Sequence, residues 1–255
     1  MRSVQGGQGS IAELISRMGA LLVPLEEADD QRRHFLAAYR RTTRAVQEEL
    51  QGGGFLDAAW VERWDLVFAG LYLDALEQWN RGQRPARPWA VAFEAAGDEE
   101  LPPLRHVLLA MNAHINYDLP LALLASITDE EFQDPVIVDR RARDHARIDA
   151  ILASRVDAED HELEKVERPG DRTLLDRCLT PFNQSATKRF MKEARRKVWR
   201  NAVVLSGARR DGPKALATRL DQLEEVASRR VAELRVPGQV LIRLAVRGFG
   251  ARLPD

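Results

Sequence analysis

Two pairs of residues at a helical spacing are the first candidates for chemistry in this sequence. His114 and Asp118 stand four residues apart in LLAMNAHINYDLPLALL. His145 and Asp149 repeat that spacing in DHARIDAIL. Because an α-helix makes one turn in about 3.6 residues, two residues four apart lie on the same face. A histidine and a carboxylate on one face can form an acid–base dyad or bind one metal ion together.

A metal-dependent enzyme is the first hypothesis. Two such pairs on adjacent helices would supply four nitrogen and oxygen ligands, a set that suits zinc, iron or manganese because no cysteine takes part. The ion would activate water for hydrolysis of an ester or phosphoester. Asp65 is a further candidate ligand, since it lies in the strongly apolar segment WVERWDLVFAGLYLDAL. The candidate ligands are His114, Asp118, Asp65, His145 and Asp149.

A metal-free enzyme is the second hypothesis. His114 and Asp118 would then be the acid–base dyad of a natural-product cyclase, dehydratase or tailoring enzyme. Tyr117, which lies beside them, is a third candidate catalytic residue, and aromatic side chains would line an apolar pocket for a small-molecule substrate. The candidate substrate-binding residues are Asn112, Asn116, Trp64, Tyr72, Trp89 and Arg195.

A non-enzymatic helical scaffold is the third hypothesis. Asn112 and Asn116 are also four residues apart, on a helix face roughly opposite that of His114 and Asp118. Burying a polar group without a partner costs about 1–3 kcal/mol, so a scaffold would pair these residues across its helix contacts. All three hypotheses use the same central helix, and the sequence alone leaves the choice between them open.

Helical periodicity predicts the fold that must position these residues. Apolar residues recur about every 3.6 residues and strand-like alternation is nearly absent, so we predict an all-α fold of about eight to ten helices. We expect one domain, with an N-terminal arm and short helix (1–27), a core bundle (28–208) and C-terminal helices (209–255). The helices are expected at about 11–22, 29–50, 57–81, 89–96, 102–120, 128–154 and 185–206, with two more starting near 213 and 237.

Capping residues mark several of the predicted helix starts. Ser10 and Asp57 are the expected N-caps of the first and third helices. Thr128 and Glu131 have the spacing of a capping box, which predicts the start of the helix through about residue 154. Pro120 lies near the end of the central helix and is expected to kink or end it.

Composition limits the class of partner. The 255 residues include 38 basic and 39 acidic side chains, a net charge of −1, and 45% are hydrophobic. So balanced a chain has no overall field that attracts nucleic acid, and we expect a small-molecule partner instead. One cysteine, Cys178, permits no internal disulfide. With no signal-peptide pattern and no run of about 18 apolar residues, we expect no membrane span and a cytoplasmic location. The oligomeric state is left open.

The motif M-N-A-H-I-N-x-D-L, at residues 111–119, is quite specific. Together with WVERWDLVFAGLYLDALEQW, RPWAVAFEAA and EARRKVWRNAVVL, it resembles an uncharacterised, mainly actinobacterial family of unknown function. The resemblance spans roughly residues 60–206. It implies an all-helical fold and no established activity.

The repeated H-x-x-x-D pattern is also similar, more distantly, to the zinc phospholipase C and P1-type nuclease group. That resemblance implies zinc ligands at His114, Asp118, His145 and Asp149, with Asp65 upstream. The group carries another histidine shortly after the first motif, where this chain has LPLALL, and it uses its exported N-terminal residue as a ligand. A full three-metal cluster is therefore not expected, and either one or two ions remain or the metals have been lost.

Overall fold

The computed structural model describes residues 9–98, 100–164, 193–194, 196–235, 248 and 250–254, with side chains described except at 149–150 and 152–164. No strand occurs in these residues, and the predicted all-α fold is confirmed. The helices are α1 (Ile11–Glu27), α2 (Arg32–Gln51), α3 (Ala58–Asn80), α4 (Arg87–Ala95), α5 (Pro103–Ala113), the π-helical segment η1 (His114–Asp118), α6 (Leu119–Ser126), α7 (Asp129–Gln133), α8 (Pro135–Glu164), a helix over 196–211, and α10 (Pro213–Arg235).

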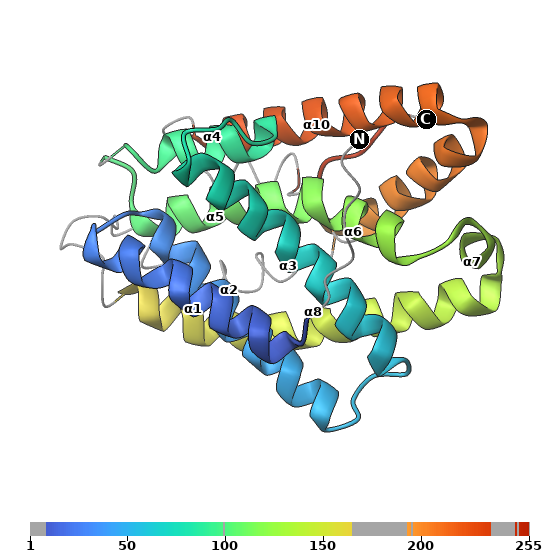
Figure 1. The fold of residues 1–255 in the computed structure, drawn as a ribbon, viewed down its shortest axis with the longest axis horizontal. Coiled ribbons are helices and arrows are strands. Elements are labelled where there is room, and N and C mark those ends of the chain that lie inside the picture. Colours follow the sequence, from blue (N-terminus) through green and yellow to red (C-terminus); the bar gives the residue numbers. More distant parts are fainter. Residues whose placement is uncertain are drawn as a thin grey trace.

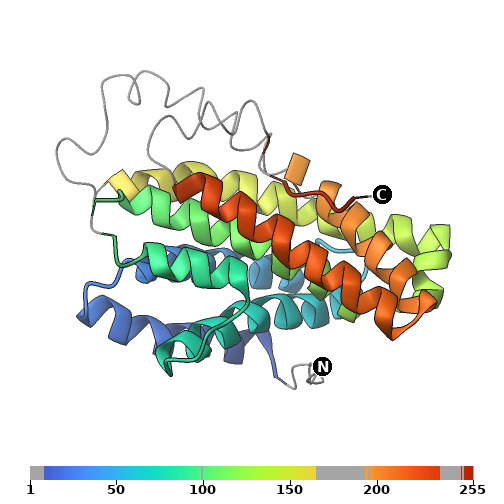
Figure 2. The ribbon, with the colours of Figure 1, turned by 90° about the horizontal axis from the view of Figure 1, so that it is seen from above.

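α5, η1 and α6 follow one another without a break and form the central segment of the fold (Figure 1). α3 packs against η1 and α6, and α10 packs against α5 and η1. α2 and α4 also contact α5, and α1 lies against α2 and α3. Figure 2, seen from above, shows α10 lying along the central segment. The helix that carries the predicted dyad is therefore enclosed by neighbouring helices.

The capping residues predicted for α1 and α3 are confirmed. The Ser10 hydroxyl accepts a hydrogen bond from the Glu13 amide at 3.2 Å, and the Glu13 carboxylate accepts from the Ser10 amide at 2.9 Å. The Asp57 carboxylate accepts from the Trp60 amide at 3.0 Å. Each bond satisfies an amide that the first helical turn leaves without a partner.

The helix predicted from Thr128 to about residue 154 is divided into two. The capping box of Thr128 and Glu131 is present, but it opens only the short α7. Pro135 starts α8, and the preceding Asp134 has the extended backbone (φ −91°, ψ 109°) that a following proline favours. The prediction of one helix was wrong because it gave Pro135 no weight as a break.

Pro120 does not end the central helix. Proline has no amide hydrogen and its ring crowds the carbonyl four residues earlier, so a regular α-helical turn is disfavoured before it. The chain instead forms the π-helical turn His114–Asp118, with the amide of Leu119 bonded to the carbonyl of His114, five residues back. α6 then continues with Pro120 in its first turn. Such π-helical turns occur often at functional sites.

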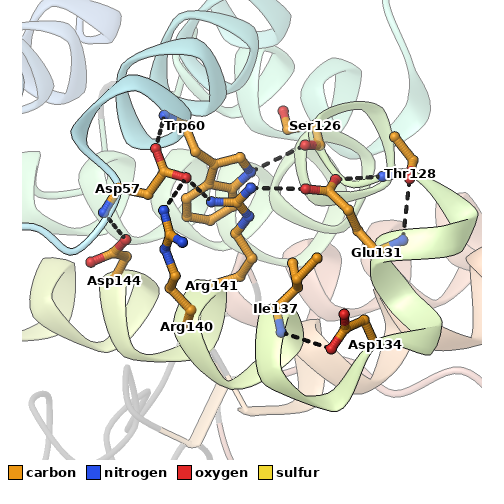
Figure 3. Close-up of polar contacts among 10 residues, drawn as sticks. All are labelled: Asp57, Trp60, Ser126, Thr128, Glu131, Asp134, Ile137, Arg140, Arg141 and Asp144. Atoms are coloured by element: carbon orange, nitrogen blue, oxygen red, sulfur yellow. Dashed lines mark hydrogen bonds and ion pairs between the residues drawn. The ribbon is translucent and has the colours of Figure 1, made fainter.

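A polar cluster fixes α8 against the start of α3 (Figure 3). The guanidinium of Arg141 donates to Asp57 at 2.5 Å and to Glu131 at 2.8 Å, and lies 4.8 Å from the ring centroid of Trp60. The Asp144 carboxylate accepts from the Asp57 amide at 2.9 Å. The cluster therefore sets the register of α8, and with it the position of the histidine that follows four residues after Arg141.

The central segment Pro103–Ser126 also has the length and apolar composition of a membrane span. Of its most hydropathic window, 78% is buried inside the described structure. The core helix of a folded domain can have the same length and apolar composition as a membrane span. The apolar composition of this segment therefore reflects its burial by neighbouring helices.

Candidate functional site

His114 and Asp118 form a buried hydrogen-bonded pair at the centre of the fold. His114 Nδ1 lies 2.9 Å from Asp118 Oδ2, and the indole N–H of Trp89 donates to the same oxygen at 2.9 Å. The two residues are 4% and 1% exposed, respectively. The spacing in the sequence thus produces a contact, and Trp89 from α4 is a third member.

Five aromatic rings surround the His114 imidazole, and together they are termed the aromatic cage. Phe68 is stacked on the imidazole, with centroids 3.7 Å apart and planes inclined by 7°. Tyr39 approaches it edge-on at 4.7 Å. The three other rings, each with its centroid 5.9 Å away, are Phe35, Tyr72 and Trp89. Charge on the dyad is therefore poorly solvated.

α3 supplies a column of stacked rings that ends on the dyad. Trp60 and Trp64 are 6.0 Å apart, and Trp64 and Phe68 are 5.4 Å apart, with interplanar angles of 17° and 15°. These residues follow one another at intervals of four, so they share one helix face. The column places Phe68 flat against His114 and fixes the plane of the imidazole.

Burial dominates the electrostatics of the dyad. It lowers the pKa of His114 well below its ordinary value and raises the pKa of Asp118 well above it, although the hydrogen bond from Trp89 opposes the second change. Burial therefore disfavours charge on both groups. In the form with both groups neutral, one proton lies between His114 Nδ1 and Asp118 Oδ2, and the imidazole proton is on Nε2.

Three buried polar atoms near the dyad lack a hydrogen-bond partner among the described residues: His114 Nε2, Tyr39 Oη and Asp65 Oδ2. The pKa of Tyr39 is raised by burial and further by the charges of Asp65 and Asp118, so both carboxyl groups lie within electrostatic reach of Tyr39. Each unpartnered group costs about 1–3 kcal/mol. A cluster of such groups is more typical of a functional site than of a packed core.

Comparison with known proteins assigns the chain to a family. Residues 11–237 match a family of unknown function, DUF5995. The chain belongs to the DUF5995 family. No curated protein and no solved structure matches it. The predicted membership of an uncharacterised helical family is confirmed.

The histidine of the second H-x-x-x-D pair of this DUF5995 protein does not lie at the first pair. His145 on α8 packs edge-on against Trp64, with centroids 5.8 Å apart, and also contacts Trp199 at 5.7 Å. Trp64 and Phe68 stand between His145 and His114 in the ring column. The side chain of Asp149 lies outside the described residues. Within the described part of the chain, no three His, Cys, Asp or Glu side chains come close enough to hold a metal ion.

The Asn116 side chain binds backbone groups rather than the dyad. Asn116 donates from Nδ2 to the Asn112 carbonyl at 3.1 Å, and its Oδ1 accepts from the Ala251 amide at 2.6 Å. Asn201 contacts the same residue, because its Nδ2 donates to the Ala251 carbonyl at 3.1 Å. Tyr117 lies between the core and α10, where burial and the charge of Glu224 raise its pKa. None of these contacts involves His114.

The cage also contains residues that were not predicted for the site. Trp89 and Tyr72 are brought to the dyad as proposed, whereas Trp64 lies one ring further along the column and Arg195 is outside the described residues. Phe68, which extends the four-residue aromatic spacing of α3, was detectable from that spacing. Phe35 and Tyr39 on α2 resemble ordinary core residues, and only the packing of α2 on α5 brings them to His114.

Proposed function

We propose that this DUF5995 protein is a metal-free enzyme in which His114 and Asp118 act as a general acid on a small apolar molecule. The observation that supports this most is the His114 Nε2 atom. It is buried, it lacks a partner among the described residues, and it lies within the aromatic cage while Nδ1 is held by Asp118. This is the arrangement of a proton donor whose acceptor is the substrate.

Dehydration of an alcohol illustrates the proton balance. The Nε2 proton of His114 passes to the substrate hydroxyl, which leaves as water, while the shared proton moves from Asp118 to Nδ1. The Asp118 carboxylate then accepts the Trp89 N–H bond, and the faces of the aromatic cage stabilise the substrate cation. A proton lost from the neighbouring carbon returns to Nε2, and the Nδ1 proton is shared with Asp118 again. A cyclisation started by protonation uses the same steps.

The described structure favours this hypothesis over metal-dependent hydrolysis. The His145 ring is separated from the dyad by Trp64 and Phe68, and among the described residues no third His, Cys, Asp or Glu side chain comes close enough to complete a metal site at His114 and Asp118. A general acid needs no further ligand. Zinc, iron or manganese binding remains the alternative to test by metal analysis of untagged protein.

A non-enzymatic scaffold is the second candidate, and the burial of the dyad favours it. With His114 4% exposed, a substrate reaches Nε2 only if part of the aromatic cage moves. In a scaffold the same contact would only fix helix packing. The two proposals differ in what Asp118→Asn does, because asparagine keeps the size and the acceptor oxygen but has no proton to give.

The test incubates the wild type, Asp118→Asn and Asp74→Asn with a library of small apolar alcohols and follows loss of water by mass spectrometry. Asp74 is on the surface of α3, with a side chain 63% exposed, and is the matched control. We expect conversion by the wild type and control, a loss of at least about 100-fold in Asp118→Asn, and unchanged unfolding of that variant. Absence of conversion, with Asp118→Asn clearly less stable, would favour the scaffold and overturn the proposal.

A further inference from the structure

A small cavity lies beside the aromatic cage, between α2, α3, α4 and α5. Its volume is about 10 Å³, which is room for about one water molecule or one hydroxyl group. Phe35 and Tyr72 line the cavity and also belong to the aromatic cage, so each of these two side chains contacts both the cavity and the His114 imidazole. Phe93 and the half-buried Arg32 line it as well.

His106 gives this cavity a hydrogen-bond acceptor. Its Nε2 lies 3.1 Å from the carbonyl oxygen of Leu101, and a carbonyl only accepts, so Nε2 carries the proton. Burial lowers the pKa of His106, which keeps the ring neutral and leaves a lone pair on Nδ1. Nδ1 is buried without a hydrogen-bond partner in the part of the chain that the structure describes, and the residue is 5% exposed. A bound molecule that donates a hydrogen bond would satisfy it.

Arg32 does not make the cavity an anion site. Its Nε donates to both Asp30 carboxylate oxygens at 2.9 and 3.0 Å, and its terminal nitrogens bind Asp30 and the Asn80 side chain. The charge is thus neutralised and most donors are used. Its guanidinium carbon lies 5.9 Å from the ring centroid of Phe93, which further holds it in place. The cavity therefore presents apolar rings and one acceptor to a neutral ligand.

We propose that this cavity binds the hydroxyl end of a small, neutral, aromatic or alicyclic alcohol. The hydroxyl donates to His106 Nδ1, and the carbon skeleton lies against Phe35, Tyr72 and Phe93. The skeleton needs more room than the cavity has, so binding displaces Phe35 or Tyr72. Because both rings also contact His114, the same displacement opens the aromatic cage. The inference goes beyond the proposed function, because His106 and His114 are eight residues apart on the central helix and the hydroxyl held at His106 is therefore not the group that His114 would protonate.

Phenol and toluene are the probes, because they match in shape and differ in the donor. Binding is followed by NMR of protein labelled with nitrogen-15 in histidine, where hydrogen bonding shifts the Nδ1 resonance of His106. We expect phenol to bind at least about tenfold more tightly than toluene, since it alone satisfies a buried acceptor. We also expect only phenol to shift that resonance. Equal affinities for the two probes, or a phenol complex without the shift, would overturn the proposal.

Two substitutions and a control locate the contact. His106→Leu should remove the preference for phenol while toluene still binds. Ala96→Leu, which fills the cavity without changing its polar groups, should weaken both probes. His34→Leu makes the same substitution at a buried histidine outside the cavity lining and should keep the preference. A preference for phenol that survives in His106→Leu would contradict the assignment, and the wild-type shift decides the case if that variant does not fold.

Repeating the titration in Asp118→Asn separates this inference from the proposed function. The variant lacks the proton of the dyad but keeps His106 and the cavity, so phenol should bind as in the wild type. Normal phenol binding by the wild type, without conversion of any alcohol by the wild type, would refute only the general-acid mechanism. Loss of the phenol preference in the wild type would refute the cavity assignment, whatever the activity.

Discussion

Asp65 should make the stability of the protein depend on pH. Its carboxyl group is 4% exposed, and burial raises its pKa from 3.8 to about 7. In the unfolded chain the same group ionises near the lower value. Between the two values the unfolded state releases a proton that the folded state keeps, so the free energy of unfolding falls as the pH rises from about 4 to about 7.

The magnitude follows from the same pKa values. Each pH unit between the folded and unfolded pKa is worth about 1.4 kcal/mol, so the whole difference costs roughly 4 kcal/mol of stability once the pH exceeds 7. Asparagine has the same shape and never ionises. Asp65→Asn should therefore unfold like the wild type at pH 4 and be more stable by roughly 4 kcal/mol at pH 8.

Urea unfolding followed by circular dichroism at several pH values between 4 and 8 measures this difference. Subtracting the wild type from the variant cancels the titration of every other group. Asp74→Asn makes the same chemical change on the surface of the same helix and should show a small, constant difference. A difference for Asp65→Asn that stays within about 0.5 kcal/mol across the range would refute the reasoning, and would mean that water or a hydrogen-bond donor reaches this carboxyl in the folded state.

Three further substitutions test the contacts that hold the site. Arg141→Ala should lower the free energy of unfolding in urea by about 3 kcal/mol, because the Arg141 side chain is 8% exposed and binds two carboxylates. Arg140 is 51% exposed, so Arg140→Ala should lower it by less than about 1 kcal/mol. Equal losses would contradict the role given to Arg141 in holding α8 against α3. Trp89→Phe removes the N–H bond to Asp118 and should lower the stability by about 1–3 kcal/mol in the same assay, so no change would mean that this bond is not formed. Ser10→Ala should lower the melting temperature through a loss of about 1 kcal/mol at the start of α1, and an unaltered transition would show that the capping box contributes nothing.

Most of the fold was predictable because its signals are local. Ser10 and Asp57 cap the helices that follow them. The apolar residues of each helix recur at the spacing of one helical turn, which can be read within the segment itself. The failure at Asp134 is local as well, since the proline that follows it was visible in the sequence. The turn at His114–Asp118 was harder, because Pro120 signals only that a regular turn is disfavoured and not which alternative replaces it.

The site was predictable only in part, because spacing fixes which residues share a face and not what that face meets. His114 and Asp118 share a turn and do pair. His145 has the same spacing to its aspartate, yet its ring meets Trp64, since the register of α8 depends on distant contacts such as that of Arg141 with Asp57. A repeated motif therefore predicts two similar turns but not one shared site.

Asn116 and His114, one from each polar stripe of the central segment, differ in a way that bears on function. Asn116 uses its side chain to bind the Asn112 carbonyl and the amide of Ala251, as expected of residues selected for packing. On the other stripe, His114 bonds Asp118 through Nδ1 and leaves Nε2 buried without a partner in the described structure. If stability alone had shaped position 114, an apolar side chain there would avoid the cost of the free nitrogen. The contrast between Asn116 and His114 therefore favours a chemical role for His114 over a purely structural one.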